Sequence, residues 1–325
     1  MGILKGKDKM KKIAWYIYGI DYVLRNKCKK IYRIPYSSRK VYTAENASKI
    51  MYDKLLSNEP FFAGRIGLFE LAAMRAYEFH NTDKYSIVMK QIYDCAGFFP
   101  LDLEMGEQFL KVCVDSLKQV DILACSGQLD ENYFMNHYMP CDAIAVSNFD
   151  VMEPWRFELP WSAALKGKKV LVVSPFEDSI REQYMIHDKI FKGTDILPDF
   201  ELLTYKSLQT TGDIVDERFV TWFEALDYMF EEISNIEFDV ALLGCGAYGF
   251  PLAAKIKKSG KQAIHMGGIL QILFGIMGKR WDGTAPGYHA MREDIAPYYN
   301  SNWTYPKQSE TPVSASKVEY GPYWR

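Results

Sequence analysis

Three glycines lie between an apolar run and an amphipathic run, at a spacing that could hold a diphosphate. Residues 238–243 have the length and composition of a buried strand, and residues 251–258 have proline near the start and lysines near the end, as helices do. Gly244, Gly246 and Gly249 form the pattern G-x-G-x-x-G between them. Glycine lets the backbone approach a phosphate, and a helix N-terminus offers unpaired N–H groups. The sequence therefore predicts a phosphate-binding loop here.

A dinucleotide-binding loop would need one more residue. An acidic side chain about 20 residues downstream, at the end of the next strand, holds a ribose hydroxyl in such proteins. Here the next predicted strand, 261–265, is followed by no acid before Asp282. The sequence therefore favours a nucleoside diphosphate over NAD or FAD, with Tyr248 of the loop as a further binding residue. The alternative is a tight turn whose glycines serve only packing.

Two further predicted strands end at residues that could meet the same ligand, because ligands of open α/β sheets bind at the carboxyl ends of strands. Arg65 could pair with a phosphate through its forked donors, and Glu70 could act as a general base or a metal ligand. The alternative is an exposed charge pair at a helix start. Ser179 follows the strand 168–174 at a helix N-terminus, where it could bind an anion or, like Glu177, serve as a capping residue.

A third group follows the glycine loop. His265 ends a predicted strand before Gly267 and Gly268, and could hydrogen-bond a diphosphate or a sugar hydroxyl, or be a structural histidine. Lys279 and Arg280, next to Trp281, combine cationic and stacking groups that suit phosphate and sugar. Basic residues are also common at helix C-termini, which is the alternative for this pair.

Composition indicates an ordinary globular chain. The protein has 325 residues, of which 48% are hydrophobic and 15% aromatic. Strand-like runs alternate with helical runs, one of which ends at Ile190; the six strand-like runs are 60–65, 120–125, 143–146, 168–174, 238–243 and 261–265. This alternation predicts an α/β, Rossmann-like fold with a mostly parallel sheet flanked by helices. The cysteines form no CxxC pair and no secretion signal is evident, so we expect reduced thiols in a cytoplasmic protein; they are Cys28, Cys95, Cys113, Cys125, Cys141 and Cys245.

The N-terminal arm, residues 1–45, is basic and precedes a single predicted domain, 46–325. Residues 1–40 hold 12 Lys and Arg against two Asp, a net charge of +10. Because the whole chain has a net charge of −2, the remaining residues carry a net charge of −12. The arm contains an amphipathic, aromatic stretch that is too short to span a bilayer. We expect it to bind the anionic inner face of the cell membrane, with a helix packed on the domain as the alternative. No nucleic-acid recognition module accompanies the charge.

Taken together and in this order, these segments resemble the GT-D class of bacterial glycosyltransferases from about residue 60 to the C-terminus. The resemblance lies in Arg65-Ile66-Gly67-Leu68-Phe69-Glu70, Pro175-Phe176 with Ser179-Ile180, the Gly244–Gly249 loop, and His265-Met266-Gly267-Gly268 running on to Gly278-Lys279-Arg280-Trp281-Asp282. It implies a Rossmann-like enzyme that transfers a sugar from a nucleotide-sugar, such as a UDP-sugar, to a glycan or lipid-linked acceptor in capsular or other cell-surface polysaccharide synthesis.

The resemblance also implies roles for single residues. Better-known members carry R-x-G-D-G-E, with an Asp-x-Glu pair beside Mn²⁺ or Mg²⁺; Glu70 matches the glutamate, whereas Leu68 replaces the aspartate. This departure indicates a metal-weak or metal-free branch. Glu70 is the expected catalytic base, with Asp102, Glu104 and Glu177 as alternatives. The expected substrate-binding residues are Arg65, Gly67, Ser179, Gly244, Gly246, Tyr248, Gly249, His265, Gly267, Gly268, Lys279 and Arg280.

Two other functions fit the same pattern. A catalytically silent nucleotide-sugar-binding scaffold would explain Leu68, since such a subunit needs no metal. A Rossmann oxidoreductase acting on a nucleotide-linked substrate is the third interpretation, and the missing ribose-binding acid argues against it.

Overall fold

The computed structural model describes residues 40–211, 214, 216–287 and 289–325. The basic arm lies almost entirely outside these residues, so its expected membrane contact stays a prediction.

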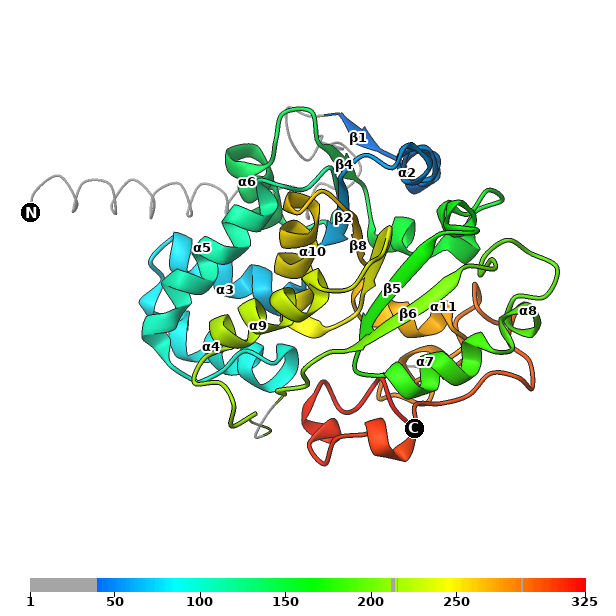
Figure 1. Cartoon of the computed structure of the whole chain (residues 1–325). Helices are drawn as coiled ribbons and strands as arrows, with labels where there is room; N and C mark the ends of the chain where they lie inside the picture. The colour runs from blue at the N-terminus through cyan, green and yellow to red at the C-terminus, as the bar shows by residue number, and fades with distance from the viewer. Residues whose placement is uncertain (1–39, 212–213, 215, 288) are drawn as a thin grey trace, which may run out of the picture.

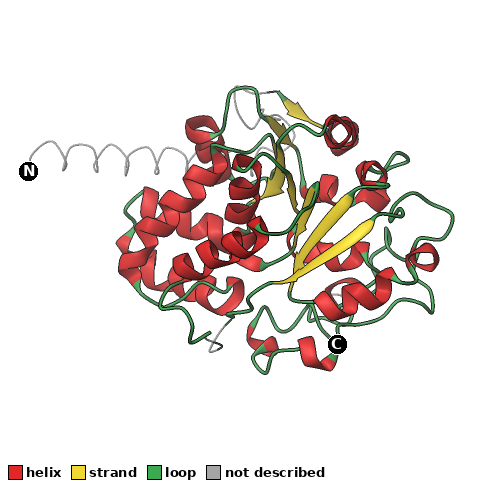
Figure 2. Cartoon of the chain, viewed as in Figure 1, coloured by secondary structure: helices red, strands yellow, loops and turns green. Residues whose placement is uncertain are grey.

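The eight strands of the described residues join one sheet in the order β1-β4-β3-β2-β8-β7-β5-β6, and every pair of neighbours is parallel. The prediction of a Rossmann-like, mostly parallel α/β fold is confirmed. Figure 2 shows the twisted sheet between two layers of helices. The strands are β1 (Val41–Tyr42), β2 (Phe61–Arg65), β3 (Ile122–Ala124), β4 (Ile144–Val146), β5 (Lys169–Ser174), β6 (Glu201–Lys206), β7 (Val240–Leu243) and β8 (Gln262–His265).

Helices cover both faces of the sheet (Figure 1). On one face lie α3 (Leu68–Glu78), α4 (Thr82–Ala96), α5 (Gly106–Leu117), α6 (Leu129–Tyr138), α9 (Trp222–Ser234) and α10 (Gly249–Lys258). On the other lie α2 (Ala44–Ser57), α7 (Glu177–Tyr184), α8 (His187–Ile190), α11 (Leu270–Leu273) and α12 (Lys279–Asp282). Because water reaches neither face, the central strands read as nearly continuous apolar runs.

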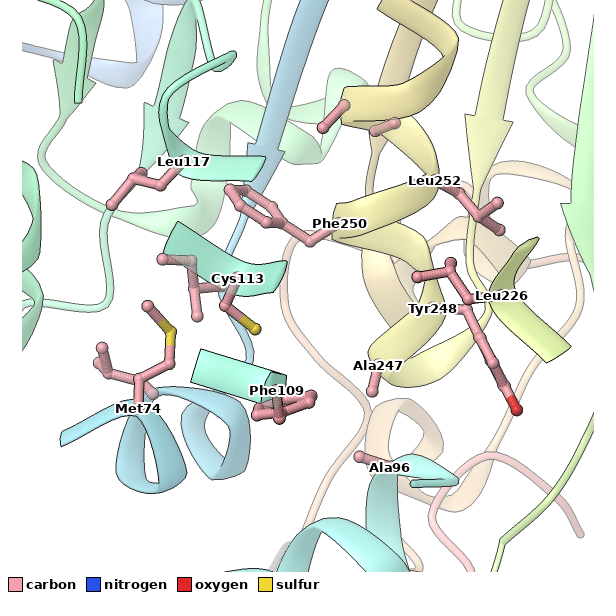
Figure 3. Packing of buried hydrophobic residues seen from close by; sticks show 14 of the residues in the cluster. Met74, Ala96, Phe109, Cys113, Leu117, Leu226, Ala247, Tyr248, Phe250 and Leu252 are labelled. Carbon is pink, nitrogen blue, oxygen red and sulfur yellow. The ribbon is translucent and has the colours of Figure 1, made fainter. Parts of the chain in front are cut away.

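Alternation along each strand divides the core into two clusters. In β5, Leu171 and Val173 point to the α10 face, whereas Val170 and Val172 point to the α7 face. Figure 3 shows the α10 face, where Phe250 and Leu252 pack among side chains of neighbouring helices. This burial fixes the register of the strands, and with it the level at which each strand ends.

Most predicted elements are present, with some differences. The six predicted strands correspond to β2, β3, β4, β5, β7 and β8. The edge strands β1 and β6 were not predicted, because β1 has two residues and β6 is half-exposed along its length. The predicted helix that ends at Ile190 is interrupted after Tyr184, where α7 stops and α8 begins at His187.

The chain leaves two pairs of neighbouring strands toward opposite faces. After β2 it enters α3 on the α10 face, whereas after β8 it enters η6 (Gly267–Ile269) and α11 on the α7 face. The pair β5 and β7 diverges in the same way, into α7 and α10. Such divergence marks the ligand-binding edge of an open parallel sheet.

Candidate functional site

Arg65 ends β2 directly opposite the loop that follows β8. Its Cδ and Nε atoms lie 3.8 and 3.9 Å from where a Cβ on Gly267 would stand. Its guanidinium stacks on the ring of Phe149, with Cζ 3.8 Å from the ring centroid. Phe149 begins η2 (Phe149–Met152), shortly after β4. A guanidinium that stacks by its face leaves the N–H donors at its edge available to a ligand.

Within the described part of the chain, the Arg65 guanidinium has no hydrogen bond and no ion pair. It is only half-buried, yet desolvation lowers its pKa. A desolvated cation without a counter-ion is costly, and an arriving anion reduces that cost. Arg65 is therefore the described residue best placed to bind a phosphate.

Glu70 stands on the first turn of α3, and its carboxylate folds back over Gly67. A Cβ on Gly67 would overlap both carboxylate oxygens, so any other residue at this position would displace the Glu70 carboxylate from where it lies. Burial raises the pKa of Glu70, while its own backbone N–H and the charge of Arg65 act in the opposite direction. Arg65 and Glu70, predicted from the sequence to act together, are brought together by the fold.

A third group comes from α12 and the C-terminal segment. The Arg280 guanidinium pairs with the Glu319 carboxylate and donates to the Tyr323 hydroxyl at 3.3 Å. The Tyr323 ring lies directly on Gly268, where a Cβ would overlap it. Arg65, Arg280, Glu319 and Tyr323 all act electrostatically on one another or on Glu70. Together with Glu70, these residues bring two cations, two carboxylates and a phenol to the β2/β8 edge.

The glycine loop is packed against protein on every side that its glycines face. A Cβ on Gly246, which has φ +57°, would lie 2.8 Å from the Ala96 carbonyl oxygen. One on Gly244 would lie 2.9 Å from the Gly267 carbonyl oxygen, and one on Gly249 would overlap the His265 ring. These contacts explain the three glycines by packing, which is the alternative that the sequence left open.

Two aromatic residues named from the sequence lie in the core. Tyr248 is 1% exposed, stacks on Trp222, and places its hydroxyl 3.0 Å from Thr210 Oγ1. Figure 3 shows its ring among the buried side chains beside α10. Trp281 is also buried, in the cluster on the α7 face. The geometry therefore gives neither ring an open face for a nucleotide or a sugar.

His265 is buried at the end of β8, beneath the start of α10. Its Nδ1 has no hydrogen-bond partner among the residues that the structure describes, and burial together with the charge of Arg65 lowers its pKa to about 3. The imidazole is therefore neutral at physiological pH. Its ring fills the space left by Gly249. In this position His265 supports the loop from below.

Ser179 already holds an anion, and that anion belongs to the chain. The Glu310 carboxylate accepts from the backbone N–H groups of Asp178 and Ser179 at 2.8 and 3.2 Å, and from Ser179 Oγ. It thus caps the N-terminus of α7, a helix with no cap of its own. Glu310 is 3% exposed, so an external anion would have to displace a buried carboxylate.

The remaining acidic candidates have other contacts. Glu177 accepts from Arg181 and Thr204, and Asp102 caps the short helix η1 (Leu103–Met105), which contains the exposed Glu104.

Lys279, the other basic candidate, begins α12 next to Arg280. It is half-buried, and its backbone N–H donates to the Trp324 carbonyl.

The donor set at this edge does not fit a divalent metal. No group of three or more His, Cys, Asp or Glu side chains with suitable geometry occurs among the described residues. Leu68 is 46% exposed beside Glu70, and Glu319, a further carboxylate at this edge, is paired with Arg280. The described residues at this edge therefore offer no ligand set for Mn²⁺ or Mg²⁺. Separately, no helix in the described ranges has the length and apolar character needed to cross a membrane.

Sequence reasoning missed four residues around Arg65. Phe149 follows a predicted strand, so its place at the carboxyl edge was a usable signal. Nothing in the sequence connects Glu319 or Tyr323 to residues 250 positions earlier. Glu131, buried after β3, also acts on the Arg65 charge, while one of its oxygens accepts from Ser126.

Comparisons with known proteins add little to this geometry. No family model matches the sequence, and no curated protein matches it. A solved structure described as a selenomethionine-substituted domain of unknown function 1792 (DUF1792) aligns with 81% of this chain and 96% of its own. The identity is 11% and the TM-score 0.34, so no functional statement about this chain follows from the match.

Proposed function

We propose that the protein is a glycosyltransferase that moves a sugar from a nucleoside-diphosphate sugar, such as a UDP-sugar, to an acceptor hydroxyl. The observation that carries the proposal is the half-buried Arg65 guanidinium, which stacks on Phe149 and forms no ion pair with any carboxylate among the described residues. The order of the sequence motifs, which resembles the GT-D class, supports the same proposal.

The geometry supports a division of roles between Arg65 and Glu70. In the reaction, the acceptor oxygen bonds to the anomeric carbon, the bond from that carbon to the diphosphate breaks, and the acceptor proton passes to a base. Arg65, with Arg280 and Lys279, would stabilise the charge on the departing diphosphate. Glu70, whose pKa is raised by burial, would take the proton, since a base acts best when its pKa lies closer to the working pH.

We further propose that the acceptor is a glycan or a lipid-linked sugar of a cell-surface polysaccharide. The basic arm would then keep the enzyme at the inner face of the membrane, next to a lipid-linked acceptor. This part rests on the sequence alone.

The proposal is tested by assaying the full chain against a panel of nucleotide-sugars, with and without Mn²⁺ or Mg²⁺. Arg65→Ala should weaken donor binding by about tenfold or more, since the cation contacts the donor before and during reaction. Arg181→Ala is the matched control, because Arg181 is an exposed arginine on α7 that pairs with Glu177. Donor binding by R65A equal to that of R181A would refute the assigned role.

A silent scaffold subunit is the second candidate, and the exposed Leu68 in place of a metal-binding aspartate favours it. It would bind a nucleotide-sugar, with R65A again impaired, but show no turnover with any acceptor fraction. The same panel therefore separates the two functions.

A further inference from the structure

The C-terminal segment is attached on both sides of Glu319. Before Glu319 in the sequence, Val318 is buried and the Glu310 carboxylate caps the N-terminus of α7. After it, Trp324 is buried and donates its Nε1–H to the Glu310 carbonyl, while the Pro322 carbonyl accepts from the Arg280 backbone N–H at 3.0 Å.

Between these attachments the backbone takes an unfavourable shape. Glu319 and Tyr320 have φ of +47° and +69°, in the left-handed region that side chains rarely adopt, and Gly321 follows at +75°. The turn is closed by the Gly321 N–H, which donates to the Val318 carbonyl at 2.8 Å. Strain of this kind persists only where the surroundings enforce it, and it clusters at functional sites.

The result of this strained turn is a carboxylate aimed at Arg280. The pair is not sealed in the core, because the Arg280 and Glu319 side chains remain 31% and 29% exposed. By contrast, Glu310 is 3% exposed and its carboxylate accepts from four donors. Of the two glutamates that this segment sends to the sheet edge, Glu319 is the one that can exchange with a ligand.

We propose that Glu319 is an internal competitor for the anion site: its carboxylate binds Arg280 in the empty protein and is displaced by the diphosphate of the donor. This inference rests on the proposed function, since it assigns Arg280 to the donor. Glu319 also lies near enough to Glu70 for the two charges to repel, so its displacement would relieve a like-charge contact at the base. In a single exchange, the donor diphosphate would then replace the Glu319 carboxylate on Arg280.

The alternative is that Glu319 is a positioning residue, whose carboxylate holds Arg280 in the correct orientation for the donor. The two roles predict opposite signs. Removing a competitor strengthens anion binding, whereas removing a positioning group weakens it.

The experiment is calorimetric titration of the full chain with UDP and with inorganic pyrophosphate. Glu319→Gln should lower both dissociation constants by about two- to tenfold, the range expected for freeing a partly exposed ion pair. Glu319→Asp, which keeps the charge on a shorter side chain, should act in the same direction. Asp227→Asn is the charge-matched control, because it breaks the Lys255–Asp227 pair on α9 and α10, and it should change neither constant.

Arg280→Ala supplies the decisive comparison. In that background Glu319→Gln should have no further effect, since the two residues act through one ion pair. Weaker or unchanged binding by both Glu319 variants overturns the inference. If no form of the protein binds either ligand, the inference and the proposed site fall together. If the affinities respond as expected but no sugar is transferred, only the proposed enzymatic function fails.

Discussion

The carboxylate of Glu70 occupies the space that a side chain on Gly67 would need. The two residues lie three positions apart at the start of α3, where the glutamate folds back over the helix N-terminus, and a side chain at residue 67 would have to displace its carboxylate. The same fold places the carboxylate near the cation of Arg65. A local helix-start arrangement thus also positions a candidate base.

Glu70→Gln should stabilise the protein at neutral pH while lowering its activity. Burial raises the pKa of Glu70, so the stability linked to its protonated form is complete below the ordinary value of 4.5 and is lost as pH rises through the folded value. Glutamine does not ionise and avoids that loss. Sugar transfer should fall by about 10²- to 10⁴-fold, as for removal of a general base. Thermal melts across pH, with a transfer assay, check both parts; undiminished transfer would place the base elsewhere.

His265 should make the protein acid-sensitive. Burial and Arg65 lower its pKa from 6.5 to about 3. Between these two pH values the unfolded chain therefore binds a proton at His265 that the folded chain does not bind. Stability from this residue is present above pH 6.5 and is lost toward pH 3, by up to about 1.4 kcal/mol per pH unit. Urea unfolding of wild type and His265→Asn over this range tests it. Parallel pH profiles for the two would contradict the prediction.

Ser179→Ala should destabilise the fold and leave nucleotide affinity intact. The substitution removes the hydroxyl that donates to the buried Glu310 carboxylate, at a cost of about 1–3 kcal/mol. Chemical unfolding measures the loss, and a UDP titration of the folded variant measures the affinity. A variant with normal stability and impaired UDP binding would instead assign Ser179 to the ligand.

Gly246→Ala should be destabilising for a reason unrelated to phosphate. The new Cβ would press on the Ala96 carbonyl oxygen and force alanine into a left-handed backbone, at a cost of about 1–3 kcal/mol. Gly260→Ala is a useful comparison, since its φ is +90° but no atom lies within 4 Å of its Cβ. Unfolding curves should show the larger loss at Gly246. Equal losses would mean that backbone strain alone, and not the packed loop, explains the glycine.

The basic arm should bind anionic membranes. Each engaged Lys or Arg contributes about 1 kcal/mol at such a surface, and salt weakens the attraction over roughly 8–10 Å. Full-length protein should therefore co-sediment with anionic liposomes at low salt, and a chain that starts near residue 41 should not. Equal recovery of both in the supernatant would end the membrane proposal.

Periodicity predicted the fold well because it depends on local rules. Runs such as 168–174 and 238–243 are apolar without interruption, which indicates strands covered on both faces. Strand β6 was not predicted because it is a half-exposed edge strand, so its hydrophobic pattern is weak. The proximity of Arg65 and Glu70 was also predictable, since both lie within six residues of a strand-to-helix turn.

By itself the sequence determined the parallel α/β architecture, the strand ends at which a ligand could bind, and the charge asymmetry of the arm. Only the tertiary structure decided what faces those ends. The glycine spacing is the same whether a loop holds a phosphate or packs on Ala96, and a serine at a helix N-terminus is the same whether its anion is a ligand or Glu310. Glu310 and Glu319 of the C-terminal segment supply the anions that Ser179 and Arg280 bind in the structure. Contacts between residues so far apart in the chain leave no periodic pattern in the sequence, so the sequence could not predict them.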